Sequence, residues 1–511
     1  MLAAPVLIVS PIDIQIGQQA CTRLRPFLPL NQASPNSASM NEPTKSTPEE
    51  PGLVRSLGSF DATMLVVGIV VGSGIFLTTG LMAKEIPSAS LILLAWVFGG
   101  LHAIAGALAF AELGAAMPEA GGQYVYLRRA YGPFVGFLFG WVAFSVYLTG
   151  IVAALAIGFA EYFGYFFPAL ATSRLLYETD FSFSGSVFHY KFSMGHIVAV
   201  VLIILLSAVN YFGVRFGKWV QNVSSAVKIG AILTLVGVGL WVTPTHPIDW
   251  SLPDTGAGGA VLATGFGVAL VSVIWTIAGW EEVSFIGGEI KNPERNLPRA
   301  LIWGVGSVTL LYVIVNYVYL RAIPMPELVG VVRVGEVASN ALFGAQGTGF
   351  LAAAVIISVL GALNGTILVG PRVYYAMAKD GLFFKSAATV NSRYRTPGAA
   401  ILLQAVWACV LTVGGAYENL IAFVTFSNLL LWIAATAAVF TLRKKYPDLP
   451  RPYKTWGYPY TPIAFIVVSV GLMLNMLWET PVEAFTGLGL AALGIPVFIV
   501  WRKKVVATDP G

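Results

Sequence analysis

The chain contains 511 residues, of which 57% are hydrophobic and only 11% are charged. Because soluble proteins carry about 25% charged residues, this composition excludes a soluble globular protein and indicates a membrane protein with many spanning helices. The net charge of +5 is spread between apolar segments, so we expect no nucleic-acid partner. The four histidines and two cysteines lack metal-ligand spacing, and neither a metal nor another cofactor is expected.

Residues 1–57 are predicted to form a disordered cytosolic tail, since residues 31–50 are rich in Ser, Pro, Asn and Thr. The apolar stretch at residues 2–16 is interrupted by prolines and is too short to span a bilayer. Met40 opens a stretch that would make an ordinary cytosolic start. We hypothesise that translation begins there, which the intact mass of the natively expressed protein would decide.

Twelve apolar segments follow, each predicted to cross the membrane as a helix. They lie near residues 60–82, 89–112, 133–163, 195–213, 221–243, 260–286, 299–322, 347–377, 398–415, 418–441, 461–478 and 484–501. We group residues 58–441 as a core of ten helices and residues 442–505 as two further helices, before a short tail at 506–511. With the N-terminus inside, the inner loops hold roughly four times as many Lys and Arg residues as the outer loops. This bias predicts a multi-pass protein of the cytoplasmic (inner) membrane with both termini in the cytosol.

Two of these segments are interrupted by glycine where a helix should continue. Gly72, Ser73 and Gly74 interrupt the first segment, and Gly279 stands beside polar residues in the sixth. Each glycine costs about 1 kcal/mol of helix stability relative to alanine, and the freed backbone groups need partners that lipid cannot offer. A packing seam between helices is the alternative. Matching breaks five segments apart instead favour two five-helix repeats of inverted topology.

Four motifs occur at these and neighbouring places. They read GSGIF in the first segment, AELGAAMPEAGGQYVYLRRAYG after the second, AGWEEVSFIGGEIKNPERNLPRAL through the sixth, and RPYKTWGYP before the eleventh. Over about residues 55–505 the chain resembles the amino acid–polyamine–organocation (APC) superfamily, closest to bacterial relatives of the L-type amino acid transporters. The resemblance implies an all-α polytopic protein of 12 transmembrane helices with the LeuT fold: a 5+5 inverted repeat with helices 1 and 6 broken, plus two helices. It also implies a carrier that moves amino acids by alternating access, and not an enzyme.

The two breaks are the predicted substrate site. An amino acid brings a carboxylate and an ammonium, and either charge is costly to bury unpaired. Backbone amides that begin the second half of the first helix carry partial positive charge and suit the carboxylate; these belong to Ser73, Gly74 and Ile75. The family pattern gives the ammonium the backbone carbonyls that end each half-helix, which fall at Val70, Trp275 and Ala278.

Two side chains of the sixth segment have predicted roles at this site. Trp275 occupies the position of the family's aromatic gate, with a packing or lipid-facing tryptophan as the alternative. Glu281 is an intramembrane carboxylate and therefore a functional candidate. It could bind the substrate ammonium, favour a polar substrate or carry a coupling proton. A salt bridge or a solvated cytosolic vestibule is the alternative explanation for Glu281.

Lys228, about 10 Å into the fifth segment, is the principal coupling candidate. Sodium-free relatives carry a lysine on this helix in place of a sodium ion, which implies that the ammonium bridges the broken first helix and the eighth helix, with Ser358 as a partner. Snorkelling to the headgroups is the alternative, and a buried lysine could also exchange protons. Arg372 is predicted to act at an inner gate or to pair structurally, with Glu112 or Glu289.

The sequence thus predicts a secondary active amino acid transporter for neutral or polar L-amino acids, which is sodium-independent and exchanges its substrates. Proton-coupled symport and a polyamine or cationic amino acid carrier are alternatives. A channel would favour a continuous polar stripe, no ATP-binding loop is present, and an amino acid sensor of the same fold stays open. Residues 164–194 contain no cysteine, so no disulfide-linked heavy subunit is expected, and the protein should be a monomer or a weak homo-oligomer in the lipid bilayer.

Overall fold

The computed structural model describes residues 53–183, 186–242, 246–252, 258–414, 417–479 and 481–507. Most of them are helical, and ten of the described helices are long and apolar enough to cross a membrane. The prediction of a polytopic helical membrane protein is therefore confirmed. Two further predicted segments correspond to shorter apolar helices, Ser59–Val70 and Gly398–Val413. The first of these is short because its segment is broken. The hypotheses about Met40 and most of the N-terminal tail lie outside the described residues.

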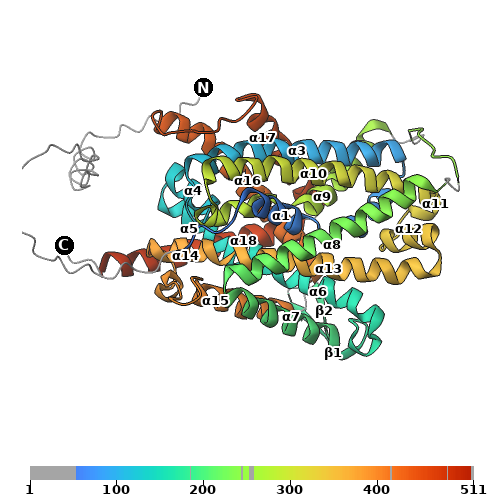
Figure 1. The fold of residues 1–511 in the computed structure, drawn as a ribbon, viewed down its shortest axis with the longest axis horizontal. Helices are drawn as coiled ribbons and strands as arrows, with labels where there is room; N and C mark the ends of the chain where they lie inside the picture. Colours follow the sequence, from blue (N-terminus) through green and yellow to red (C-terminus); the bar gives the residue numbers. More distant parts are fainter. Residues whose placement is uncertain are drawn as a thin grey trace, which may run out of the picture. The chain divides into compact units, whose positions relative to one another are not determined.

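The described part of the first half of the chain contains eight α-helices and one hairpin, whose arrangement can be followed in Figure 1. Its elements are α1 (Ser59–Val70), η1 (Gly74–Phe76), α2 (Thr78–Glu85), α3 (Ala89–Ala116), α4 (Gln123–Tyr131), α5 (Pro133–Val142), η2 (Ala143–Tyr147), α6 (Leu148–Phe166), η3 (Pro168–Leu170), β1 (Leu175–Phe183), β2 (Ser186–Ser193), α7 (Met194–Tyr211) and α8 (Val214–Trp241). The segments α5, η2 and α6 form one continuous span with a π-helical turn at η2.

The second half begins with another broken span. Its elements are α9 (Gly258–Ile277), η4 (Trp280–Glu289), α10 (Pro293–Ala322), α11 (Met325–Leu328), α12 (Val334–Phe343), α13 (Ala345–Val369), α14 (Pro371–Lys379), η5 (Lys385–Ala388), α15 (Gly398–Val413), α16 (Tyr417–Lys445), α17 (Tyr460–Glu479) and α18 (Pro481–Ala507). The part of the sixth span after the break is wound as a 3₁₀-helix that is kinked at Ile286. This tighter winding turns each residue by about 120°.

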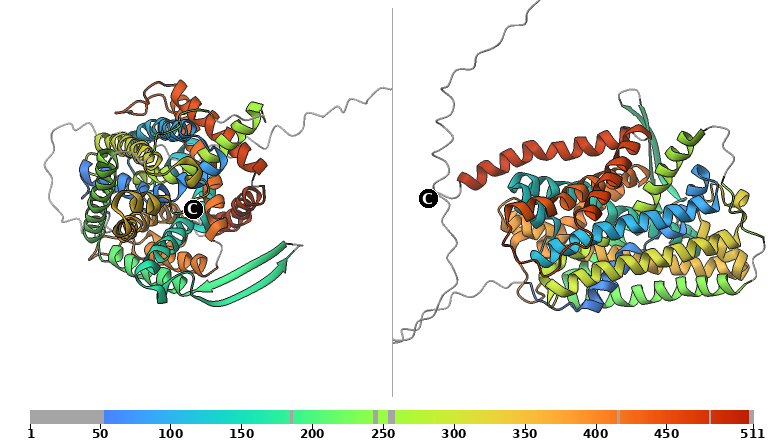
Figure 2. Two further views of the ribbon diagram at one scale, coloured as in Figure 1. Left: turned by 90° about the vertical axis from the view of Figure 1, so that its right-hand side faces the viewer. Right: turned by 90° about the horizontal axis from the view of Figure 1, so that it is seen from above.

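Small residues allow the central helices to approach closely. The most extensive helix pair is α3 with α10, which run side by side in Figures 1 and 2. A Cβ on Gly100 of α3 would lie 2.0 Å from Thr309 Cγ2 of α10, so only glycine fits. Without a hydrophobic driving force between helices in lipid, such close packing is a main source of their association.

The segment between α6 and α7 forms an antiparallel hairpin that the sequence had indicated only as an outer loop. Glu178 on β1 pairs with Lys191 on β2, and their side chains form an ion pair of 3.2 Å. The hairpin projects away from the helices (Figure 2).

Candidate functional site

The breaks of the first and sixth spans lie against each other. After α1 ends at Val70, regular α-helix resumes only at Thr78, with a single 3₁₀ turn between. The Thr78 hydroxyl lies 2.9 Å from the Thr276 hydroxyl of α9, which joins the two broken spans directly. A Cβ on Gly74 would lie 2.8 Å from Thr276 Oγ1 and 3.2 Å from its Cα. The glycine is therefore required by the close approach of the two backbones.

A cavity of about 60 Å³ opens between these breaks. Since a buried water occupies about 10–15 Å³ on this measure, the cavity has room for a few water molecules or a small solute. Four spans contribute its wall: Ile69, Val70, Gly72, Ser73 and Gly74 from the first, Ile151 and Leu155 from α6, Trp275, Thr276, Ala278, Gly279 and Glu282 from the sixth, and Thr366 from α13. Trp275 is half-buried there, and Ile75 lies behind the wall.

The backbone amides of the first break are available as donors. Those of Ser73, Gly74 and Ile75 donate no hydrogen bond to any described group, whereas the amide of Phe76 donates to the Ser73 carbonyl at 3.0 Å. The sequence predicted that these amides would begin the second half-helix. Instead, Ser73 lies just before the turn η1, Gly74 and Ile75 lie within it, and α2 starts only at Thr78.

The three carbonyls predicted to face an ammonium are not equally available. The Val70 carbonyl accepts from the Gly72 amide at 2.8 Å and from the Tyr312 hydroxyl of α10 at 3.0 Å, so both of its lone pairs are used. In this conformation the Val70 carbonyl has no lone pair left for an ammonium, and its part in substrate binding stays a prediction. The Trp275 carbonyl accepts one bond, from the Ala278 amide at 3.2 Å, and the Ala278 carbonyl accepts none from the described residues.

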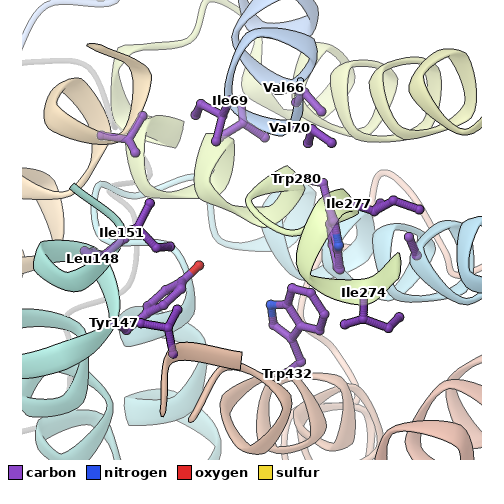
Figure 3. Close-up of a cluster of buried hydrophobic side chains, with 14 of the residues drawn as sticks. Val66, Ile69, Val70, Tyr147, Leu148, Ile151, Ile274, Ile277, Trp280 and Trp432 are labelled. Carbon is purple, nitrogen blue, oxygen red and sulfur yellow. The ribbon is translucent and has the colours of Figure 1, made fainter. Parts of the chain in front are cut away.

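Two adjacent carboxylates of η4 are fully buried but point to different sides. Glu282 lies in the cavity wall beside Thr366. Glu281 is not part of the cavity wall, and its Oε1 accepts a hydrogen bond of 2.5 Å from the Tyr147 hydroxyl. Figure 3 shows Tyr147 and Trp432 in one cluster of buried side chains. The sequence assigned substrate contact to Glu281, but the structure has Glu282 at the cavity instead.

Neither carboxylate forms an ion pair or faces solvent within the described part of the chain. Both oxygens of Glu282 and Oε2 of Glu281 have no hydrogen-bond partner there. The salt-bridge and vestibule explanations of Glu281 therefore do not fit its surroundings. Unsatisfied buried acceptors of this kind are costly, which marks the pair as a place where a proton, water or substrate donor would bind.

Lys228 connects three helices beneath the first break. Its Nζ donates to the carbonyls of Gly68 (2.8 Å), Val71 (2.6 Å) and Ser358 (2.7 Å), and only 1% of the residue is exposed. The Ser358 hydroxyl also donates to the Val71 carbonyl, at 2.8 Å. Snorkelling does not fit this position, because the ammonium is enclosed by protein carbonyls.

The helix that carries Lys228 begins earlier than its apolar segment, at Val214 rather than near residue 221. At 1.5 Å per residue, Lys228 lies about 21 Å from the start of α8.

Arg372 lies outside the cavity wall and pairs with Glu289, the last residue of η4. The pair is bidentate, at 2.6 and 3.1 Å, and both side chains are at most 1% exposed. The Glu289 carbonyl also accepts from the amides of Ser56 and Leu57, just before α1. Glu112, the other predicted partner, binds Arg443 instead. Arg372 thus helps to hold together the ends of both broken spans.

Two broken membrane helices around a small buried cavity are an arrangement typical of a membrane permease. Residues 57–501 match the family described as Amino acid permease, and the chain belongs to this family, within the APC superfamily. It is similar to the Serine/threonine exchanger SteT of Bacillus subtilis, at 30% identity over 89% of this chain and 99% of that protein. It is also similar to the human Large neutral amino acids transporter small subunit 2 (28% identity; 88% of this chain, 82% of the relative) and to the Branched-chain amino acid permease BcaP of Bacillus subtilis (27% identity; 90% and 95%). The predicted family and its L-type relatives are confirmed.

Proposed function

We propose that this permease is a sodium-independent amino acid exchanger that works by alternating access with a LeuT-type core. The single observation that carries sodium independence is the Lys228 ammonium, held between the broken first span and α13 by three carbonyls. Oxygen atoms from such a break would otherwise suit a bound cation. A side-chain cation already neutralises them and leaves no need for a sodium ion.

The backbone groups around the cavity support recognition of a zwitterionic amino acid. The free amides of Ser73, Gly74 and Ile75 supply donors for a carboxylate, and the carbonyls of Trp275 and Ala278 supply acceptors for an ammonium. Such pairing offsets the cost of moving both charges out of water. Trp275, half-buried in the wall, is our candidate for the gate over the bound substrate.

The proposed substrate is a small neutral amino acid with a polar side chain. Two observations favour this class: the cavity is small, and Glu282 presents carboxylate oxygens without partners in its wall. A hydroxyl or amide donor on the substrate would satisfy them. The name of the relative SteT, a serine/threonine exchanger, agrees with this choice.

Counterflow in proteoliposomes tests the exchange. Vesicles with the purified full-length protein are preloaded with one unlabelled amino acid, and uptake of labelled serine is followed in sodium or choline buffer, with and without a pH gradient. We expect uptake only into preloaded vesicles and equal rates in the two salts. Dependence on sodium would contradict the role of Lys228, and serine binding without uptake would indicate a sensor.

Proton-coupled symport is the second candidate, favoured by the buried pair Glu281 and Glu282, which lacks a cationic partner among the described residues. In the same assay it predicts serine accumulation in empty vesicles when the outside is acidic. Unlabelled lysine and putrescine, added as competitors of labelled serine, test the alternative of a cationic substrate, because a carboxylate in the cavity would also attract an ammonium.

Substitutions distinguish the roles of the two carboxylates, Glu281 and Glu282. Glu282→Gln keeps the shape of the side chain but removes its charge, and a hydrogen bond to a charged group contributes about 1.5–3 kcal/mol. We expect the preference for serine over alanine to fall roughly tenfold. Glu281→Gln is the matched control and should leave this ratio unchanged. Equal ratios in both variants would contradict the contact with Glu282.

The proposed orientation has both termini in the cytosol and the protein in the inner membrane, as the loop charges predict. We also propose that the protein works without a disulfide-linked subunit, as a monomer or weak homo-oligomer. The one cysteine in the described part, Cys409, is half-buried in α15.

A further inference from the structure

A second cavity lies at the corner between α7 and α8, away from the substrate site. Its volume is about 250 Å³, several times that of the first cavity. The wall combines Phe212, Arg215 and Phe216 at the corner with Arg393, Tyr394 and Arg395 from the loop before α15.

The cavity is strongly basic. Arg215, Arg393 and Arg395 are exposed, and none of them forms an ion pair with another described residue. The ten residues of the wall include no carboxylate. Three uncompensated guanidinium groups around one hollow suit a phosphate group, because arginine binds its oxygens in a bidentate fashion.

The loop that carries two of the arginines is fixed by its own hydrogen bonds. The Asn391 side-chain oxygen accepts from the amides of Arg393 (2.9 Å) and Tyr394 (3.0 Å), and the Asn391 carbonyl accepts from the Arg395 amide at 2.8 Å. Thr396 then binds the Tyr211 carbonyl at the end of α7. The cavity is therefore a built feature that joins three parts of the chain.

The position of the cavity favours a lipid as the source of the phosphate. It lies where two membrane helices end, at Tyr211 and Val214. Phe212 and Phe216 are 50% and 62% exposed, and the neighbouring Trp219 is 66% exposed. Aromatic residues of this kind concentrate at the level of the lipid headgroups, and basic pockets between spanning helices bind anionic headgroups.

We propose that this basic corner pocket binds the phosphate headgroup of an anionic phospholipid. The pocket also includes Val54 and Ser56, and the Ser56 amide donates to the Glu289 carbonyl at 2.9 Å. A bound headgroup therefore contacts the segment that leads into α1, next to the end of the other broken span. Lipid in this pocket restrains the motion of that segment.

Native mass spectrometry of the purified full-length protein tests the site directly. The protein is titrated in detergent with phosphatidylglycerol, with phosphatidylcholine, and with inorganic phosphate as competitor. We expect wild-type protein to prefer phosphatidylglycerol, and the triple variant Arg215→Gln, Arg393→Gln, Arg395→Gln to lose roughly tenfold or more of that affinity. Melting temperatures of the variants are measured without lipid, and an unchanged value shows that the variant still folds. The single variant Arg393→Gln provides a milder change of the same pocket.

A matched control removes the same charge elsewhere. Lys291 precedes α10, Arg295 and Arg299 lie in its first turns, and all three are exposed, on the inner side in the proposed orientation. The triple Lys291→Gln, Arg295→Gln, Arg299→Gln should keep the lipid preference. Equal loss in both triples would mean that net charge, not the pocket, attracts the lipid. Phosphate that binds alone and displaces the lipid at equal concentration would identify a free-phosphate site. Either result overturns the proposal, and neither depends on whether the protein exchanges amino acids.

Discussion

Replacement of Lys228 by methionine removes the ammonium while preserving most of the side-chain volume. Three carbonyls then lose a charged donor, but they are not equally affected. The Val71 carbonyl keeps the Ser358 hydroxyl, and the Ser358 carbonyl belongs to the helix α13. The Gly68 carbonyl has no other donor among the described residues. The Gly72 amide, which would bind it in a continuous helix, donates to the Val70 carbonyl instead.

The expected magnitude follows from that one orphaned carbonyl. A buried acceptor without a partner costs about 1–3 kcal/mol, which corresponds to a shift of about 5-fold to 150-fold between conformations that make and do not make the bridge. We therefore expect serine counterflow by Lys228→Met to fall at least fivefold at equal amounts of reconstituted protein. Lys228→Arg should also fail, because the side chain is only 1% exposed and its three carbonyl partners already lie 2.6–2.8 Å from Nζ, which leaves the larger guanidinium no room.

The matched control lies one residue away. Val227 is 43% exposed on the outer side of α8, so Val227→Ala should transport at the wild-type rate. If Lys228→Met exchanged serine with wild-type rate and half-saturation, the bridge would have no part in transport and the reasoning would be refuted.

Three further predictions concern other parts of the chain. Arg372→Met should lower the melting temperature strongly, because an unpaired buried carboxylate costs about 3–5 kcal/mol, and Glu289→Leu in the same chain should recover much of the loss; no recovery would argue against the pair. Gly74→Ala should cost about 1–3 kcal/mol of stability and slow exchange by overpacking, whereas Gly230→Ala, with open space around its Cβ, should be silent in the same melting and counterflow assays. A cysteine at exposed Ser392, in a cysteine-free background, should react with an impermeant maleimide only in permeabilised cells; labelling of intact cells would reverse the proposed orientation.

The sequence predicted the breaks in the first and sixth spans because their cause is local. Gly72, Gly74 and Gly279 weaken the helix wherever they stand, and neighbouring residues do not alter that cost. The partner of the Val70 carbonyl could not be predicted in this way. It comes from Tyr312, more than two hundred residues away, and depends on how α10 packs against α1.

Which of the two carboxylates faces the cavity could not be predicted from the sequence, for a different reason. Glu281 and Glu282 are adjacent, and which of them faces the cavity depends on how the backbone is wound after the break. The sequence did not indicate that η4 is a 3₁₀-helix, in which neighbouring residues differ by about 120° in direction. The family pattern named the position of Glu281, whereas Glu282 is the carboxylate that lies in the cavity wall.

The start of the helix that carries Lys228 was predicted too late for a reason of polarity. Residues 214–221 include Arg215, Lys218 and Gln221, which delay the start of an apolar segment. In the structure Gln221 is buried and Lys218 binds Asp61 of α1 at 2.6 Å. The helix therefore begins earlier than its hydrophobicity suggests, because packing against α1 satisfies these polar groups.

A cation that is covalently part of the carrier has an energetic consequence for the cell. The Lys228 ammonium cannot be released into either compartment, so no sodium gradient can act through it. A free monovalent cation that crossed with the substrate would add about 2.3 kcal/mol per 100 mV of membrane potential, or roughly a 50-fold gain in accumulation. Under the proposed mechanism this permease forgoes that gain: the direction of net flux follows the amino acid pools on the two sides, and the protein equalises their ratios rather than filling the cell.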